Sequence, residues 1–93
     1  MMLVELVQIK RSRGRLSLNK IYLNPSHIVF ISENSSLRSS VNEVKELGLV
    51  PQTIFSTIRL NDNGTYSEIE VVGEPSMIES KIFKKKKQNI LRS

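Results

Sequence analysis

The first half of the chain predicts a β-hairpin followed by a central strand. Residues 3–9 are rich in branched apolar side chains and form an extended segment with apolar residues on both faces. This pattern predicts a strand that is buried on both faces, and a second subunit could bury one of them. A polar break with a glycine at 11–15 suits the hairpin tip, and residues 16–23 form the return strand. After the turn Asn24-Pro25-Ser26, in which Asn24 can close an Asx-turn, residues 27–32 are the clearest strand.

The middle of the chain predicts a loop and a short helix. Residues 33–40 are polar and rich in serine, which indicates a loop. Ser40 fits the N-cap of a helix, with Glu43 at the reciprocal capping-box position. Val44 would then face the body of the protein, and Gly48 would take the left-handed conformation that ends many helices.

A second hairpin and a final helix are predicted after this segment. Residues 53–60 alternate between apolar and polar positions, Asn61-Asp62-Asn63-Gly64 indicates a tight turn, and residues 65–72 return. Ser76 fits the N-cap of a helix with Glu79 at its third position.

These elements predict a small α+β fold in one domain. Its core is an antiparallel β-sheet of four to five strands in a meander, with a C-terminal helix packed on it and a short inserted helix or loop at 34–52. The domain covers residues 1–83, and a basic C-terminal tail or helix end covers 84–93. Because so small a meander leaves strand edges exposed, we expect the protein to form a homo-oligomer, with a dimer as its simplest form.

The residues that carry most enzyme chemistry are scarce. The chain has no cysteine, which excludes disulfides, thiolate metal sites and cysteine nucleophiles. His27 is the single histidine, and we interpret it as a turn residue that begins a strand. Glu68 and Glu70 share a strand face and could divide acid and base roles, but a solvated outer face is the favoured interpretation. We predict no catalytic residue, no metal and no cofactor, and hence a protein that is not an enzyme.

The location expected from the sequence is the cytoplasm. The first residues lack the charged and apolar regions of a signal peptide, and no apolar run reaches the length of a membrane span. A small secreted domain would usually contain disulfides, and this chain cannot form one.

The positive charge is concentrated near the C-terminus. Of the 14 Lys and Arg residues, six lie between Lys81 and Ser93, which leaves eight against all nine acids in residues 1–80. Two basic clusters are candidate polyanion-binding residues, namely Lys10, Arg11, Arg13 and Arg15 in the first hairpin, and Lys84, Lys85, Lys86 and Lys87 in the tail. If the hairpin tip and the helix end lie close together, the clusters form one phosphate-binding patch. The simpler interpretation of the lysine run is a solvated helix end. Two further interpretations are that the run binds an acidic protein partner or a membrane surface.

Several segments together resemble a known family. They are Lys20 to Glu33, Ser56 to Gly64, and Glu70 to Pro75, followed by Ile78 and Ile82. Over roughly residues 18–87, this pattern is similar to that of the small FlbD-like proteins, which are found beside flagellar genes and, in related forms, in phages and mobile elements. The resemblance implies a β-meander with a final helix that ends in lysines, and no catalytic residues. The insertion from Asn34 to Gln52 and the long first hairpin depart from the family pattern.

Two functions remain open at the level of the sequence. The first is a small interaction or regulatory module of a bacterium or phage, which contacts an unidentified protein partner through a sheet edge or the inserted loop. The alternative is a protein that binds nucleic acid or a phosphorylated ligand through the basic hairpin and the lysine tail. Deletion of residues 84–93 separates them, because only the second function would lose its binding.

Overall fold

A computed structural model describes residues 3–35 and 41–92 of the protein, with side chains described outside 41–43 and 84–92. The predicted cap at Ser40 therefore lies outside the described residues. The elements in chain order are β1 (Val4–Ser12), β2 (Arg15–Leu23), the 3₁₀ helix η1 (Pro25–His27), β3 (Ile28–Glu33), α1 (Val41–Glu46), β4 (Phe55–Asp62), β5 (Thr65–Val72) and α2 (Pro75–Arg92). The predicted small antiparallel β-sheet with a C-terminal helix is confirmed, and strands account for more of the fold than helices do.

The five strands form one antiparallel sheet in the order β2-β1-β5-β4-β3. This order corrects the predicted meander, because β2 and β3 follow each other in the chain but form the two edges of the sheet. β1 takes a central position between β2 and β5, as suits a strand with apolar side chains on both faces. The pairing of β1 with the last strand joins distant parts of the chain, which a local pattern does not reveal.

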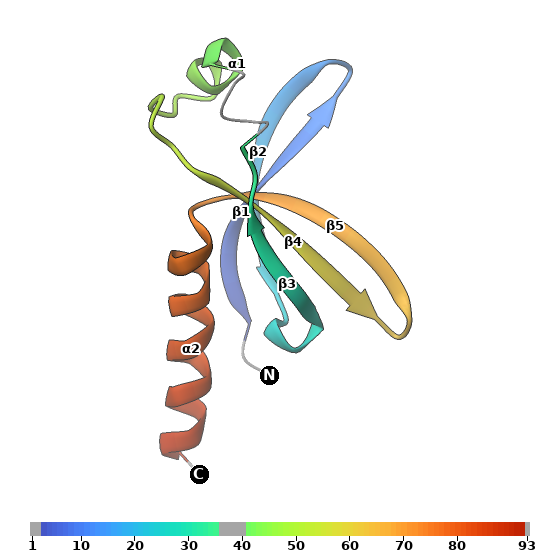
Figure 1. The fold of residues 1–93 in the computed structure, drawn as a ribbon, viewed down its shortest axis with the longest axis vertical. Helices are drawn as coiled ribbons and strands as arrows, with labels where there is room; N and C mark the ends of the chain where they lie inside the picture. The colour runs from blue at the N-terminus through green and yellow to red at the C-terminus, as the bar shows by residue number, and fades with distance from the viewer. Residues whose placement is uncertain (1–2, 36–40, 93) are drawn as a thin grey trace.

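The two hairpins meet only briefly and then diverge. β1 and β5 pair through Gln8 with Val71 and Ile9 with Glu70. On either side of this contact, the β1–β2 hairpin extends toward the top of Figure 1, while the β4–β5 hairpin extends toward the lower right. The tip of the first hairpin therefore lies away from the second hairpin.

Both hairpins close with two-residue turns. Arg13 and Gly14 have φ of 54° and 77°, and Asn63 and Gly64 have φ of 52° and 88°. Positive φ at both central residues is the geometry of the type I′ turn, whose twist matches that of the strands. Because the first turn is confined to Arg13 and Gly14, β1 and β2 extend further than the sequence predicts. Lys10, Arg11 and Arg15 therefore lie on paired strands, and Arg13 lies in the turn.

The core has two clusters, and β1 contributes to both. Val4 and Leu6 lie in the larger cluster with Ile58, Val71 and Ile78, the last of which comes from α2. Ile9 lies in a second cluster with Val44 and Phe55, to which α1 contributes Val44. Since side chains alternate along a strand, these clusters cover opposite faces of β1. The predicted two-sided cover is therefore confirmed, and residues of the same chain contribute to it on both faces.

The start of α2 differs from the prediction. The backbone N–H groups of Met77 and Ile78 donate to the carbonyl of Glu74 at 3.1 and 3.2 Å, so the helix begins at Pro75 rather than being capped by Ser76. Proline suits the first helical position because it lacks an N–H and its φ is already helical. The Ser76 hydroxyl donates instead to the Glu74 carboxylate at 2.9 Å.

The predicted inserted helix is present as α1. Val44 is buried as expected, and Gly48 has a φ of 78°. The Gly48 N–H donates to the carbonyl of Lys45 at 2.9 Å, which ends the helix. This short helix lies beside the first hairpin, and that position is important for the candidate site (Figure 1).

Candidate functional site

The basic residues of the first hairpin lie at the end of a paired ribbon. We call residues 8–19 the basic arm. Lys10, Arg11, Arg13 and Arg15 are all exposed and fall within six positions that contain no acid. The closest acids along the chain are Glu5 and Glu33. The arm therefore concentrates positive charge on a short, hydrogen-bonded part of the sheet.

The second predicted cluster lies at the other end of the molecule. α2 starts near the centre and runs downward in Figure 1, away from the basic arm at the top. The helical backbone carries residues 84–87 in that direction. The single phosphate-binding patch expected for neighbouring clusters does not form within one chain, because the arm and the helix leave the sheet in opposite directions.

The strand register sorts the arm into two faces. Lys10 pairs with Ser17, Ser12 with Arg15, and at the base of the arm Gln8 pairs with Asn19. Paired residues and alternate residues of a strand point to the same side of a ribbon. These six side chains form what we call the polar face of the arm, which consists of Gln8, Lys10, Ser12, Arg15, Ser17 and Asn19. All are exposed except Gln8, which is half-buried.

The opposite face of the hairpin is anchored in the second core cluster. Ile9 is buried there with Phe55 and Val44, and Leu16 packs against the same cluster. Since burial of each aliphatic side chain contributes about 1.5–3 kcal/mol, the ribbon is held at its base by apolar contacts with α1 and β4. The polar face therefore lies on a ribbon whose opposite face packs against the protein core at its base.

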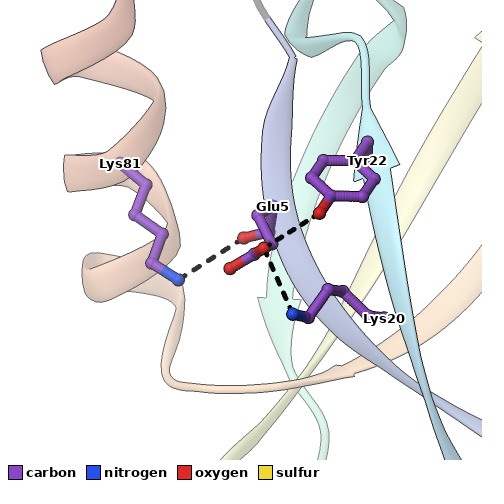
Figure 2. A network of polar contacts seen from close by, with 4 residues as sticks. All are labelled: Glu5, Lys20, Tyr22 and Lys81. Carbon is purple, nitrogen blue, oxygen red and sulfur yellow. Dashed lines mark hydrogen bonds and ion pairs between the residues drawn. The ribbon is translucent and has the colours of Figure 1, made fainter.

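Lys20 belongs to a separate cluster around Glu5. Figure 2 shows Glu5 between α2 and β2: Lys20 Nζ lies 3.6 Å from Glu5 Oε1, and the Tyr22 hydroxyl donates to the same oxygen at 3.2 Å. Lys81 Nζ donates to the backbone carbonyl of Glu5 at 3.4 Å. Both members of the ion pair are more than half exposed, so the pair contributes at most about 1 kcal/mol. Glu5 therefore interacts with Lys20, which lies outside the arm.

The two hairpins carry opposite charge. Residues 4–23 contain five bases, namely Lys10, Arg11, Arg13, Arg15 and Lys20, and one acid, Glu5. Residues 55–72 contain three acids, namely Asp62, Glu68 and Glu70, and one base, Arg59. The net charges are therefore +4 (five minus one) and −2 (one minus three). This charge difference would favour contact of a negatively charged molecule with the first hairpin.

The other residues with candidate chemistry lie in the turn before β3 and on β5. The backbone N–H of His27 donates to the carbonyl of Asn24 at 3.0 Å, and Asn24 Oδ1 accepts from the backbone N–H of Ser26 at 3.0 Å, which confirms the Asx-turn. Glu70 accepts a hydrogen bond from Asn34 Nδ2 at 3.2 Å, and Glu68 is exposed. Over residues 3–35 and 41–92, no group of three metal-ligating side chains comes together, and no helix is long and apolar enough to cross a bilayer.

A different surface is exposed at the edge strand β3. Val29 is 51% exposed and Phe30 is 44% exposed. The pairing with β4 shifts register between Ile28 and Phe30, which indicates a bulge at Val29. Exposed apolar side chains on an unpaired strand edge favour contact with another protein.

The uncharged part of the polar face was not identified from the sequence. Four residues of this face carry no charge and belong to no motif, so the sequence predicts only the basic residues as polyanion-binding candidates. These four are Gln8, Ser12, Ser17 and Asn19. The signal that could have found them was the recurrence of polar residues at positions 8, 10 and 12, together with the absence of acids from 6 to 32.

No family model, curated protein or solved structure matches this chain. The interpretation of the basic arm therefore depends on its own geometry and charge.

Proposed function

We propose that this protein is a non-enzymatic binding module whose basic arm binds a polyanion, with nucleic acid as the principal class. The observation that carries the proposal is the position of Lys10, Arg11, Arg13 and Arg15 at the exposed end of an anchored ribbon. Because the backbone of the arm is already ordered, binding of phosphates to these cations would cost side-chain entropy but little backbone entropy. Their binding also releases the counterions condensed on the nucleic acid, which favours association.

The lysine run has a separate part in this proposal. Since α2 carries residues 84–87 away from the arm, the two clusters contact different segments of a long polyanion rather than one phosphate group. We also propose a cytoplasmic location, which the cysteine-free composition favours and in which nucleic acid is accessible.

Salt-dependent binding of a labelled short DNA duplex tests the proposal. We expect the affinity of the wild type to fall steeply between about 50 and about 200 mM salt. A variant with Lys10→Gln and Arg15→Gln should bind more weakly, and the slope of its salt dependence should fall by about one for each phosphate that the variant no longer neutralises. The matched control is Lys20→Gln with Lys45→Gln, which removes two exposed cations outside the arm. Equal binding by both double variants contradicts the proposal.

Protein contact through the edge of β3 is the second candidate function. It is favoured by the exposed Val29 and Phe30, because an extended peptide can add to such an edge by main-chain hydrogen bonds. It would correspond to the small interaction or regulatory module that is the first function predicted from the sequence. In nuclease-treated extracts, Phe30→Lys should lose a specific protein partner that the Lys10→Gln, Arg15→Gln variant keeps. Loss of the partner by the arm variant alone would assign protein binding to the arm instead.

A further inference from the structure

We infer that the polyanion is double-stranded DNA and that the polar face of the arm enters its major groove. This inference rests on the proposed function and adds the class of nucleic acid and the groove that is contacted. The observation behind it is the composition of the polar face, which combines two cations with two amides and two hydroxyls. Charge alone would suffice for phosphate binding, whereas amides and hydroxyls can form directional hydrogen bonds with base edges.

The shape of the arm suits this groove. The ribbon has two strands and, among the described residues, no third neighbour from Lys10–Ser17 to Ser12–Arg15, and it joins the sheet at Gln8–Asn19, where β1 also pairs with β5. Paired strands lie about 5 Å apart, and the major groove of B-form DNA is about 12 Å wide and admits a two-stranded ribbon. α2 packs on the same side of β1 as the polar face, but at Val4 and Leu6, and it runs away from the arm. The polar face is therefore open where the groove would receive it.

The side chains of the polar face match the pattern of donors and acceptors in that groove. The amide of Asn or Gln can bind both N6 and N7 of adenine, and Arg or Lys can bind O6 and N7 of guanine. Asn19 is exposed beside half-buried Gln8, while Lys10 and Arg15 lie nearer the tip. Arg13 lies in the turn itself and is placed to contact the sugar–phosphate backbone.

Other nucleic acids fit this surface less well. The major groove of duplex RNA is deep and narrow, so that side chains on a ribbon cannot reach its bases. Single strands are usually bound by stacking on aromatic rings, and the six residues of the polar face include no aromatic residue. An acidic protein surface, including the acidic hairpin of a second copy, would engage the cations but would not require the amides.

The test begins with the selection of duplexes from a randomised DNA library by the full-length protein. We expect a preferred sequence to emerge and to bind more tightly than a scrambled duplex, a single strand of the same sequence or the corresponding RNA duplex. Protection of guanine N7 from methylation is expected, because that atom lies in the major groove.

Two variants separate sequence recognition from charge. Asn19→Ala should lower the ratio of affinities for the preferred and scrambled duplexes by at least about fivefold, while its binding to the scrambled duplex stays salt-dependent and close to that of the wild type. Gln8→Ala provides a second test of the same kind, with circular dichroism to show that the half-buried site still folds. The Lys10→Gln, Arg15→Gln variant should weaken binding to both duplexes.

The different failures are distinguishable. If the protein binds polyanions without a preferred duplex, or binds RNA or single strands equally well, the groove inference is wrong and the proposed function stands. Protection of adenine N3 alone would place the contact in the minor groove and would also overturn the inference. If no nucleic acid binds, both the inference and the proposed function are wrong.

Discussion

The hydroxyl of Ser56 donates a hydrogen bond to the carbonyl oxygen of Gly73 at 2.7 Å. Ser56 lies in β4 and is fully buried, while Gly73 lies between β5 and α2. The N–H of Gly73 donates in turn to the carbonyl of Ile54 at 2.7 Å. These two bonds hold the point at which the chain leaves the sheet and enters the final helix.

Replacement of Ser56 by alanine should destabilise the protein by about 1–3 kcal/mol, because the Gly73 carbonyl would lose its partner in a partly buried place. Urea unfolding followed by circular dichroism measures this free energy. Ser67→Ala is the matched control, since Ser67 is exposed on the neighbouring strand and its replacement should cost less than about 0.5 kcal/mol. Equal effects of the two substitutions would show that the hydrogen bond to Gly73 contributes no net stability.

Replacement of Gly73 by alanine should also destabilise the protein, by about 1–3 kcal/mol, for a different reason. Gly73 has a φ of +123°, which side chains of L-residues rarely allow. A steric clash is not the reason for the expected loss of stability, because an added Cβ would lie 3.8 Å from Ile78 Cγ1, an ordinary contact distance. The same unfolding measurement on Ser80→Ala, an exposed site in α2, provides the control. An unchanged free energy of unfolding for Gly73→Ala would mean that the chain does not require this backbone conformation.

The features that could be predicted from the sequence are local ones. Asn63-Gly64 closes a hairpin because these residues tolerate positive φ, and Asn24 caps a turn two residues away. The predicted cap at Ser76 was wrong because Pro75 also suits a helix start, and two neighbouring signals competed.

The features that could not be predicted depend on contacts between distant parts of the chain. The pairing of Ile9 with Glu70 sets the strand order, and no local pattern identifies it. The same long-range geometry separates the basic arm from the lysine run. The cations of the arm could be identified as residues, but their polar companions, such as Asn19, required the strand register.

The larger core cluster is expected to dominate the stability of the fold. Ile58 in β4 is 0% exposed and lies at the centre of this cluster, so Ile58→Ala should cost about 2–5 kcal/mol through reduced burial and the cavity left behind. Leu18→Ala serves as the control, because Leu18 is 39% exposed on the edge strand β2 and buries less apolar surface. Thermal unfolding of the two variants should give a much lower midpoint for Ile58→Ala. Similar midpoints would contradict the placement of Ile58 in the core.

Self-association, expected from the exposed strand edges, should depend on β3 rather than on β1. Both faces of β1 are covered within one chain, whereas Phe30 on the edge strand β3 is 44% exposed beside Val29. If chains associate through this edge, Phe30→Lys should shift the monomer–oligomer equilibrium toward monomer, since a lysine on the edge disfavours pairing with another strand. Sedimentation equilibrium at several protein concentrations measures the shift. Met77→Lys is the matched control, because it places the same charge at a 55% exposed apolar residue of α2. An oligomer that persists in Phe30→Lys and dissociates in Met77→Lys would place the interface on the helix, and a wild type that is monomeric at every concentration would refute the expected homo-oligomer.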